Sequence, residues 1–236
     1  MWRWLAVTGL ATLAWGQQAI STRAGLVQRV EGRAQVSDVG PEGLPTNTFV
    51  HLEPGQRMRT LRGRAEVVLA PGVYARFNAF SEIELVSAGF SDIRVRLIEG
   101  ALLADLWEGK PGRDYNVMLL YGDVEIHPEK RGEYELVARP AAPAELRVHD
   151  GKASVRLGRR TIRVSDAAEL PLEKAGWGAE RELTIDDSLR FRLIDWSRRR
   201  RAELATSRKE APLWTDGPDL KDGSLPPSAP TGAPLP

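Results

Sequence analysis

The fold of this chain is decided by the stretch Gly63-Arg64-Ala65-Glu66-Val67-Val68-Leu69-Ala70-Pro71-Gly72-Val73-Tyr74-Ala75-Arg76-Phe77. Its first half alternates at a period of two, so that Ala65, Val67 and Leu69 share one face. That spacing is typical of a β-strand with one buried and one wet face. Pro71-Gly72 then forms a turn, because glycine tolerates the positive φ that tight turns require. The stretch therefore predicts two antiparallel strands.

The same alternation extends from about residue 24 to residue 165, where helical spacing is scarce. Two further runs place their apolar side chains on one face: Ile93, Val95 and Leu97, and then Ala153, Val155 and Leu157. Turn-forming pairs separate the runs: Glu31-Gly32, Pro54-Gly55, Pro71-Gly72, Glu99-Gly100 and Asp150-Gly151. Their intervals suit short antiparallel connections. We expect a mainly β fold.

One unit recurs, consisting of a strand, an acidic residue followed by glycine, and a second strand. It occupies Val30 to Val36, Ile98 to Leu102 and Val148 to Val155. Such recurrence is typical of a solenoid-like β-roll, in which each coil covers the open edge of the previous one. A stack of two sheets of short antiparallel strands produces similar hairpins and stays the alternative. We favour the solenoid-like arrangement.

The pattern changes after Leu183. Residues 186–209 are predicted to form one C-terminal amphipathic helix, capped by Asp186 or Asp187, with Leu189, Leu193 and Trp196 on one face. Basic residues are concentrated in its second half, where the helix dipole favours positive charge. They are Arg198 to Arg201, Arg208 and Lys209. Residues 211–236 are rich in proline and predict a disordered tail.

The amino terminus has the layout of a signal peptide. A basic start at Arg3 precedes an apolar run from Trp4 to Leu13, and Ala14-Trp15-Gly16 places small residues at the positions that a signal peptidase reads. The run is shorter than the ~20 residues that a membrane-spanning helix needs. We expect residues 1–16 to be removed before Gln17, leaving a periplasmic or secreted protein with no transmembrane segment. Peripheral contact with a membrane stays open.

Composition excludes several classes of function. The 33 basic and 32 acidic side chains nearly cancel, so no strong overall field is present to hold a nucleic acid. The chain contains no cysteine, which excludes disulfides, thiolate metal sites and a cysteine nucleophile.

The stretch from Gly25 to about Leu106 resembles the FecR domain family. Five pieces carry the resemblance, in the family's order: Val30, Gly32, Ala34 and Val36; Gly55 to Thr60 followed by Gly63 to Leu69; Pro71 to Phe77; Ser81 with Leu85; and Leu97 to Leu102. The block from Tyr115 to Val164 is similar to the continuation in such proteins, although His127 to Lys130 replace a Gly-Thr pair. The segment with Phe191 and Trp196 is similar to the carboxy-terminal part of exported, stand-alone relatives.

The resemblance implies a β-rich extracytoplasmic module that senses a signal or binds a protein. It gives a FecR-like domain at residues 24–110 and a second β segment at 111–183 packed on the first. The best-known members have a cytoplasmic helical segment and a transmembrane helix that pass a signal to a sigma factor. Neither is expected in this sequence, so only the binding module carries over, without catalytic residues.

Other candidate sites have ordinary structural explanations. His51, His127 and His149 lack metal-motif spacing and are expected to be solvated surface histidines. The acidic pairs suit an acid and base two residues apart, but outward-facing glutamates on a wet strand face explain them as well. These pairs are Glu82 with Glu84 and Glu133 with Glu135.

Basic and aromatic residues are the remaining candidates. Arg198 to Arg201 have the charge to bind anionic headgroups or an acidic protein face. Four consecutive residues, however, point in different directions around a helix and do not form one patch. Trp107, Trp177 and Trp214 lie near chain bends and suit stacking on a sugar or partner, whereas Trp196 is expected in the core.

The sequence therefore predicts a non-enzymatic binding or sensing module with no catalytic, cofactor-binding or metal residues. Its expected partner is an envelope protein or a cell-surface glycan. An envelope glycan hydrolase and a passive structural envelope protein are the alternatives.

Overall fold

The computed structural model describes residues 24–36, 50–140, 142–173, 176–183 and 193–210. The chain divides into two units, Met1–Ser197 and Arg198–Pro236, and every strand belongs to the first. The predicted signal peptide (1–16), the predicted tail (211–236) and the predicted start of the helix (186–192) lie outside the described residues.

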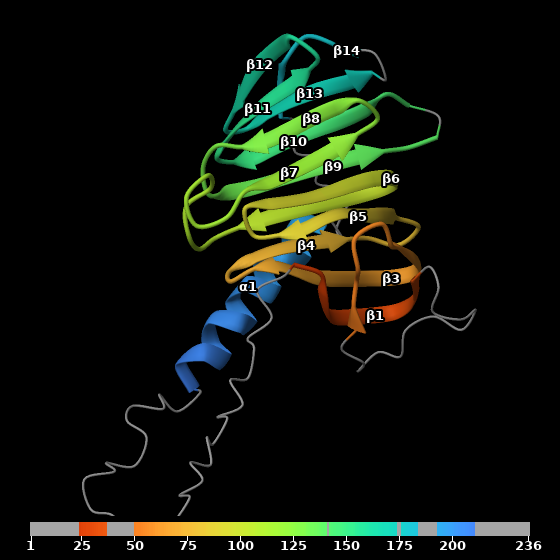
Figure 1. Ribbon diagram of the computed structural model, residues 1–236, viewed down its shortest axis with the longest axis vertical. Coiled ribbons are helices and arrows are strands. Elements are labelled where there is room, and N and C mark those ends of the chain that lie inside the picture. Colours follow the sequence, from red (N-terminus) through yellow and green to blue (C-terminus); the bar gives the residue numbers. More distant parts are fainter. Residues whose placement is uncertain (1–23, 37–49, 141, 174–175, 184–192, 211–236) are drawn as a thin grey trace, which may run out of the picture. The chain divides into compact units, whose positions relative to one another are not determined.

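The described residues form a mainly β fold with one helix (Figure 1). The first strands are β1 (Leu26–Val36), β2 (Val50–His51), β3 (Arg57–Ala70), β4 (Val73–Phe77), β5 (Glu82–Gly89), β6 (Asp92–Leu106), β7 (Val117–Tyr121) and β8 (Val124–Pro128). The others are β9 (Gly132–Ala138), β10 (Ala144–Asp150), β11 (Lys152–Leu157), β12 (Arg160–Ser165), β13 (Ala168–Glu173), β14 (Gly176–Trp177) and β15 (Arg181–Glu182), and the helix is α1 (Leu193–Glu210).

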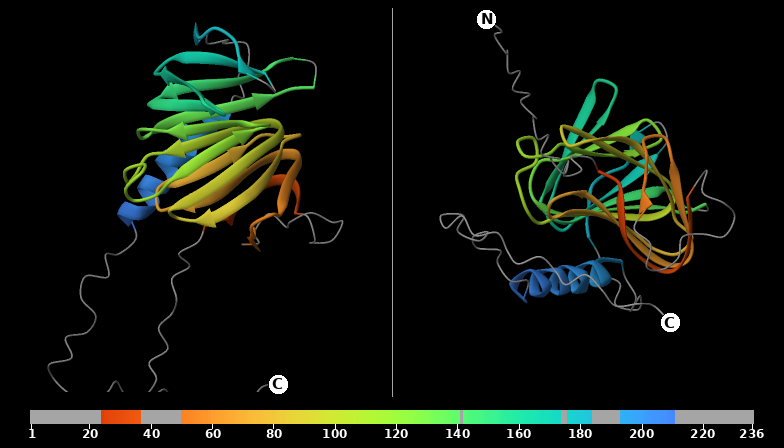
Figure 2. Two further views of the ribbon diagram at one scale, coloured as in Figure 1. Left: turned by 45° about the horizontal axis from the view of Figure 1, so that its top comes forward. Right: turned by 60° about the horizontal axis from the view of Figure 1, so that its bottom comes forward.

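Strand pairing arranges the first unit as a roll of two layers. In the first layer, β3, β4, β6, β9, β10 and β13 follow one another by antiparallel pairing. In the second layer, the order is β3, β5, β6, β7, β8, β11 and β12. The two layers are joined because β1, β3 and β6 are long strands that run through both. The strands follow their sequence order along the roll, and its end-on view is in Figure 2.

The long strands change layer at glycines. Gly32 of β1 lies directly opposite Gly63 of β3, and Gly100 of β6 adjoins the connection between β4 and β5. All three have positive φ. A Cβ on Gly63 would overlap the carbonyl oxygen of Glu31, so only glycine permits this close approach of two backbones. We call this side of the roll the bend edge; it includes Gly32, Gly63, Gly100 and residues 78–81.

The chain changes layer at the opposite side through residues 107–116, 129–131, 151 and 166–167, which we call the crossover edge. Tyr134 holds part of this edge from inside the core. Its hydroxyl donates to the carbonyl of Lys130 at 2.7 Å and accepts the N–H of Lys152 at 3.0 Å. One buried phenol thus joins two successive crossings of the chain.

Apolar side chains from both layers meet in one core between them. The three predicted apolar faces all point into it and are buried, except for Leu157, which is partly exposed. The prediction of a mainly β fold with a C-terminal helix is confirmed. The structure adds one parallel pairing, between β6 and β7, and strands longer than the short ones expected, because these strands cross both layers.

We expect Gly63→Ala to lower the free energy of unfolding by about 2–4 kcal/mol, because the added Cβ combines unfavourable φ with a backbone overlap. Urea denaturation measures the change. Gly122→Ala is the matched control: φ is also positive, but no atom lies within 4 Å of the new Cβ, so only about 1 kcal/mol should be lost. Equal losses would contradict the role of the bend edge.

We expect stability to fall in alkaline solution. Burial raises the pKa of Tyr134 to about 12 and the pKa of Tyr115 to about 12. The unfolded chain therefore loses these protons from about pH 10 while the folded chain keeps them until about pH 12, and stability declines across that window. Each phenol contributes up to about 1.4 kcal/mol per pH unit. Urea midpoints over this range measure the slope.

Tyr134→Phe should make that decline shallower, since one titrating phenol is gone, even though its lost hydrogen bonds lower stability at neutral pH. Tyr121→Phe, at a partly exposed position, serves as the control substitution. An identical alkaline slope in Tyr134→Phe and the parent protein would be inconsistent with this assignment.

Candidate functional site

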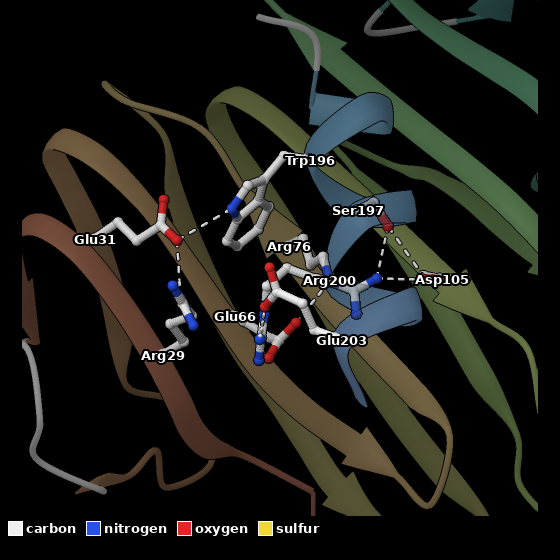
Figure 3. Close-up of polar contacts among 9 residues, drawn as sticks. All are labelled: Arg29, Glu31, Glu66, Arg76, Asp105, Trp196, Ser197, Arg200 and Glu203. Carbon is white, nitrogen blue, oxygen red and sulfur yellow. Dashed lines mark hydrogen bonds and ion pairs between the residues drawn. The ribbon is translucent and has the colours of Figure 1, made fainter. Parts of the chain in front are cut away.

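Four polar side chains are completely buried together on the outer face of the first layer (Figure 3). The guanidinium of Arg76 is central. Its Nε donates to Glu66 Oε2 at 2.7 Å, and its Nη1 donates both to Asp105 Oδ2 and to Ser197 Oγ, the latter at 2.6 Å. Ser197 in turn donates to Asp105 Oδ2 at 3.2 Å. We call these four residues the Arg76 cluster.

Strand register brings the three charged members together. Glu66 on β3 lies directly opposite Arg76 on β4, and Arg76 lies opposite Leu103 on β6, two residues before Asp105. The inner faces of these strands are occupied by core residues, so the charged side chains must point outward. The ring of Tyr74 lies 4.7 Å from the guanidinium carbon, which adds a cation–π contact.

The cluster receives the first residues of α1. Leu193, Ile194 and Trp196 pack against Leu103 on the same outer face, and Ser197 adds its hydroxyl to the cluster. Trp196 Nε1 donates to Glu31 Oε1 at 3.2 Å. The predictions that the helix has an apolar face for docking and that Trp196 is buried are confirmed for these residues.

This geometry suits attachment better than chemistry. Two carboxylates share one guanidinium, and the serine hydroxyl is bound on both sides, so the carboxylates and the hydroxyl are already committed to partners. Arg76 Nη2 is buried without a hydrogen-bond partner among the described residues. A buried ion pair adds little net stability, but removing one member leaves the others desolvated and is costly. The Arg76 cluster therefore makes the position of Ser197, at the start of α1, depend on one specific arrangement of charges.

A second polar network crosses the same layer on β9, β10 and β13. Arg147 lies 2.6 Å from Glu145, 3.4 Å from Glu169 and 3.9 Å from Glu135. His149 Nε2 lies 2.9 Å from Glu135 Oε2. The expectation of a solvated surface histidine is wrong for His149, because this pairing takes it out of solvent.

The prediction that Glu133 and Glu135 belong to a wet strand face is also wrong. Their exposed fractions are 3% and 7%. Both lie on β9, in the middle of the first layer, where β6 and β10 pair with it on either side. Glu135 is paired with His149 and lies near Arg147, so Glu135 belongs to a structural ion-pair network.

The other candidates lie on the second layer, whose outer face carries paired charges. Glu82 lies 3.5 Å from Arg57, and Glu84 lies 3.8 Å from Arg96. These carboxylates are partly exposed and paired across strands.

Farther along the second layer, Glu125 lies between Arg156 and His127, which is 3.5 Å away and partly exposed. Burial alone would raise the pKa of Glu125, but hydrogen bonds and charge from Arg156 and then His127 outweigh it and lower the pKa below its usual value.

The remaining histidine and tryptophans are scattered. His51 is partly exposed on β2. Trp177 is partly exposed, with the guanidinium of Arg160 4.9 Å from its ring, and Trp107 lies beside Tyr74 at 6.4 Å between ring centroids. Trp214 lies outside the described residues. Within α1, Arg200 pairs with Glu203 at 2.5 Å.

Within the described ranges, no three side chains of His, Cys, Asp or Glu gather as a metal site requires. In the same part of the chain, no helix has both the length and the apolar character needed to span a bilayer.

Comparison with known proteins gives structural neighbours alone. No family model matches the chain, and no curated protein does. Two crystal structures of a proposed anti-sigma factor from Parabacteroides distasonis are similar to it, at 12% and 11% identity with TM-scores of 0.44 and 0.45. In each case the match covers 53% of this chain and 59% of the other, which is less than two-thirds of that protein. The described residues form a two-layer β-roll, and the first residues of α1 pack on it.

Sequence reasoning missed the Arg76 cluster. One signal was present: Asp105 is a lone carboxylate inside the apolar run Ala101 to Trp107, where a charge needs a buried partner. Glu66 and Arg76 occupy the polar positions of ordinary alternating strands, and the local pattern does not reveal that Ser197 reaches the same place.

We expect Arg76→Met to lower the free energy of unfolding by about 3–5 kcal/mol, because it removes the guanidinium that two buried carboxylates contact. The combined variant Glu66→Leu, Arg76→Met, Asp105→Leu should recover most of that loss, since no charge is then left buried. Urea denaturation measures both.

Ser197→Ala is the milder companion substitution and should cost about 1 kcal/mol, the usual value of one hydrogen-bonding group. If the combined variant were as unstable as Arg76→Met alone, the uncompensated charges would not be the cause of the loss.

Proposed function

We propose that this protein is a non-enzymatic, FecR-like binding or sensing module of the bacterial envelope, acting outside the cytoplasm through protein–protein contacts. The proposal combines the ordered FecR-like turns and the signal-peptide pattern of the sequence with the way charged groups are used in the fold. A cell-surface glycan is the second class of ligand that such a surface would suit.

One observation carries the proposal: three of the four glutamates that the sequence offered as acid and base are held in ion pairs. Glu135 is tied to His149, and Glu82 and Glu84 are paired with arginines of neighbouring strands. A general acid or base needs a carboxyl group free to exchange a proton with substrate. These carboxylates instead organise rows of alternating charge, which is the kind of surface that gives a protein interface its specificity.

The outer face of the second layer presents these rows. Strands β3 and β6 carry arginines on this face, while β5 between them carries glutamates. Such exposed pairs add little to stability, with a median below about 1 kcal/mol each. Their regular placement is better explained by recognition of a partner whose charges are arranged to match.

The test uses the full chain expressed in a bacterium with its own amino terminus. We expect the protein in the periplasm or medium, beginning at Gln17, and a stoichiometric partner co-purifying with it from envelope extract. Glu82→Gln with Glu84→Gln, and Glu133→Gln with Glu135→Gln, should produce no change in any glycan-hydrolysis assay, because the parent protein has no such activity.

Three outcomes would contradict the proposal. Unprocessed protein in the cytosol would exclude the envelope location. Turnover of cell-wall or surface polysaccharide that disappears in a Glu→Gln variant would make it a hydrolase. Export without a specific protein or glycan partner would favour a passive structural role.

A further inference from the structure

Phe80 is an exposed aromatic residue in an unfavourable backbone conformation. Its φ is 57°, and the exposed fraction of the residue is 66%. Positive φ is strained for a bulky residue, and an exposed ring gains little from burial in return. Asparagine or glycine would suit the backbone here better, so folding alone does not account for a phenylalanine.

The strained turn is held firmly at the bend edge. Thr60, which is buried, accepts the N–H of Ser81 at 3.1 Å, and its carbonyl accepts the N–H of Phe80 at 2.9 Å. Ser81 Oγ accepts the N–H of Ala101 on β6 at 3.0 Å. These hydrogen bonds therefore hold the backbone of the Phe80 turn between β3 and β6.

Arginines flank Phe80 on the β3 side. Arg62 lies between Thr60 and Arg64 in the sequence. Thr60 accepts the N–H of Phe80, and Arg64 Nε donates a hydrogen bond to Asn78 Oδ1 at 3.2 Å, so both neighbours of Arg62 contact the turn. Arg33 on β1 is directly opposite Arg62 in the strand register, and both side chains are exposed. Like charges facing each other across strands destabilise a sheet. Neither arginine has an ion-pair partner among the described residues.

A third arginine lies on the β6 side. Arg139 directly follows Ala138, which pairs with Gly100 on β6. Gly100 in turn lies against the Phe80 turn, because a Cβ on Gly100 would meet the backbone of Phe80 and Ser81. Arg139 is exposed and, within the described ranges, also has no ion-pair partner. The nearby carboxylates are already engaged: Glu99 with Arg59, and Glu31 with Arg29.

We propose that Arg33, Arg62, Phe80 and Arg139, which we call the edge patch, bind an acidic segment of a partner protein that also presents an apolar side chain to Phe80. This deepens the proposed function and rests on it. Three arginines without an ion-pair partner in the described part of the chain supply the charge complement for carboxylates. Aromatic and arginine side chains are enriched at the centres of protein interfaces. A rigid turn favours a partner of defined shape over a fluid membrane.

The experiment titrates the full mature chain with short synthetic peptides in which several aspartates or glutamates flank one leucine. Backbone amide NMR shifts should change saturably at the edge patch, and the affinity should weaken as salt is added. Arg33→Glu with Arg62→Glu and Arg139→Glu should reduce the affinity about tenfold or more. Phe80→Asn should reduce it several-fold while leaving the unfolding midpoint unchanged or higher, because asparagine tolerates positive φ.

The matched control reverses the same number of charges at the crossover edge, with Lys110→Glu, Lys130→Glu and Arg131→Glu, all exposed positions. It should bind the acidic peptides within about twofold of the parent, since long-range charge effects are screened at physiological salt. Equal loss in the control and edge-patch variants would overturn the proposal, as would the absence of saturable shifts with the acidic peptides.

Vesicles of phosphatidylglycerol and phosphatidylethanolamine are titrated in parallel. Vesicle binding that depends on the edge patch, without peptide binding, would replace the proposal with a membrane contact. The outcome is separable from the proposed function: if the envelope partner still co-purifies with the edge-patch variants, the module binds through another surface, and the edge patch alone is excluded.

Discussion

The structure depends on the passage of three long strands from one layer to the other. At this passage the backbones of β1 and β3 meet at Gly32 and Gly63, closer than any side chain would allow. Beyond this crossing β3 continues through the first layer, where it pairs with β4 and Glu66 lies opposite Arg76. The bend edge also carries the turn that presents Phe80, so the strand that supplies Glu66 and the edge patch meet at the same passage of the backbone.

Much of the fold follows from local pattern, whereas the polar sites do not. Alternation placed Ala65, Val67 and Leu69 in the core because a strand buries every second residue. The register was harder to predict: counting outward from the Pro71-Gly72 turn would set Glu66 opposite Phe77. An irregularity in the ladder between Val68 and Ala70 shifts the pairing by one residue. No local signal in the alternation marks that shift, and the Arg76 cluster depends on it.

Burial of charge distinguishes the two faces of the roll. On the first layer, Glu66, Arg76, Asp105 and Glu135 are outward-facing yet buried, and their hydrogen bonds demand particular partners. Apolar contacts alone are nondirectional and would let a helix turn slide along the sheet. Ser197 accepts a hydrogen bond from Arg76 and donates one to Asp105. Both bonds form only when Ser197 lies at one place on the sheet. The polar groups therefore determine where the first turn of α1 docks, while the apolar residues supply most of the driving force.

The second layer and the bend edge use charge differently. Across β3, β5 and β6, arginines alternate with glutamates, so the surface neutralises itself strand by strand. Among the described residues this compensation stops at the bend edge: Arg33 faces Arg62, and Glu31 and Glu99 are paired with other arginines. The same sheet pairs opposite charges on neighbouring strands elsewhere, so the fold does not require an arginine on both strands at this place. Repulsion and backbone strain at the same place are together better explained by a partner that relieves them than by any requirement of the fold itself.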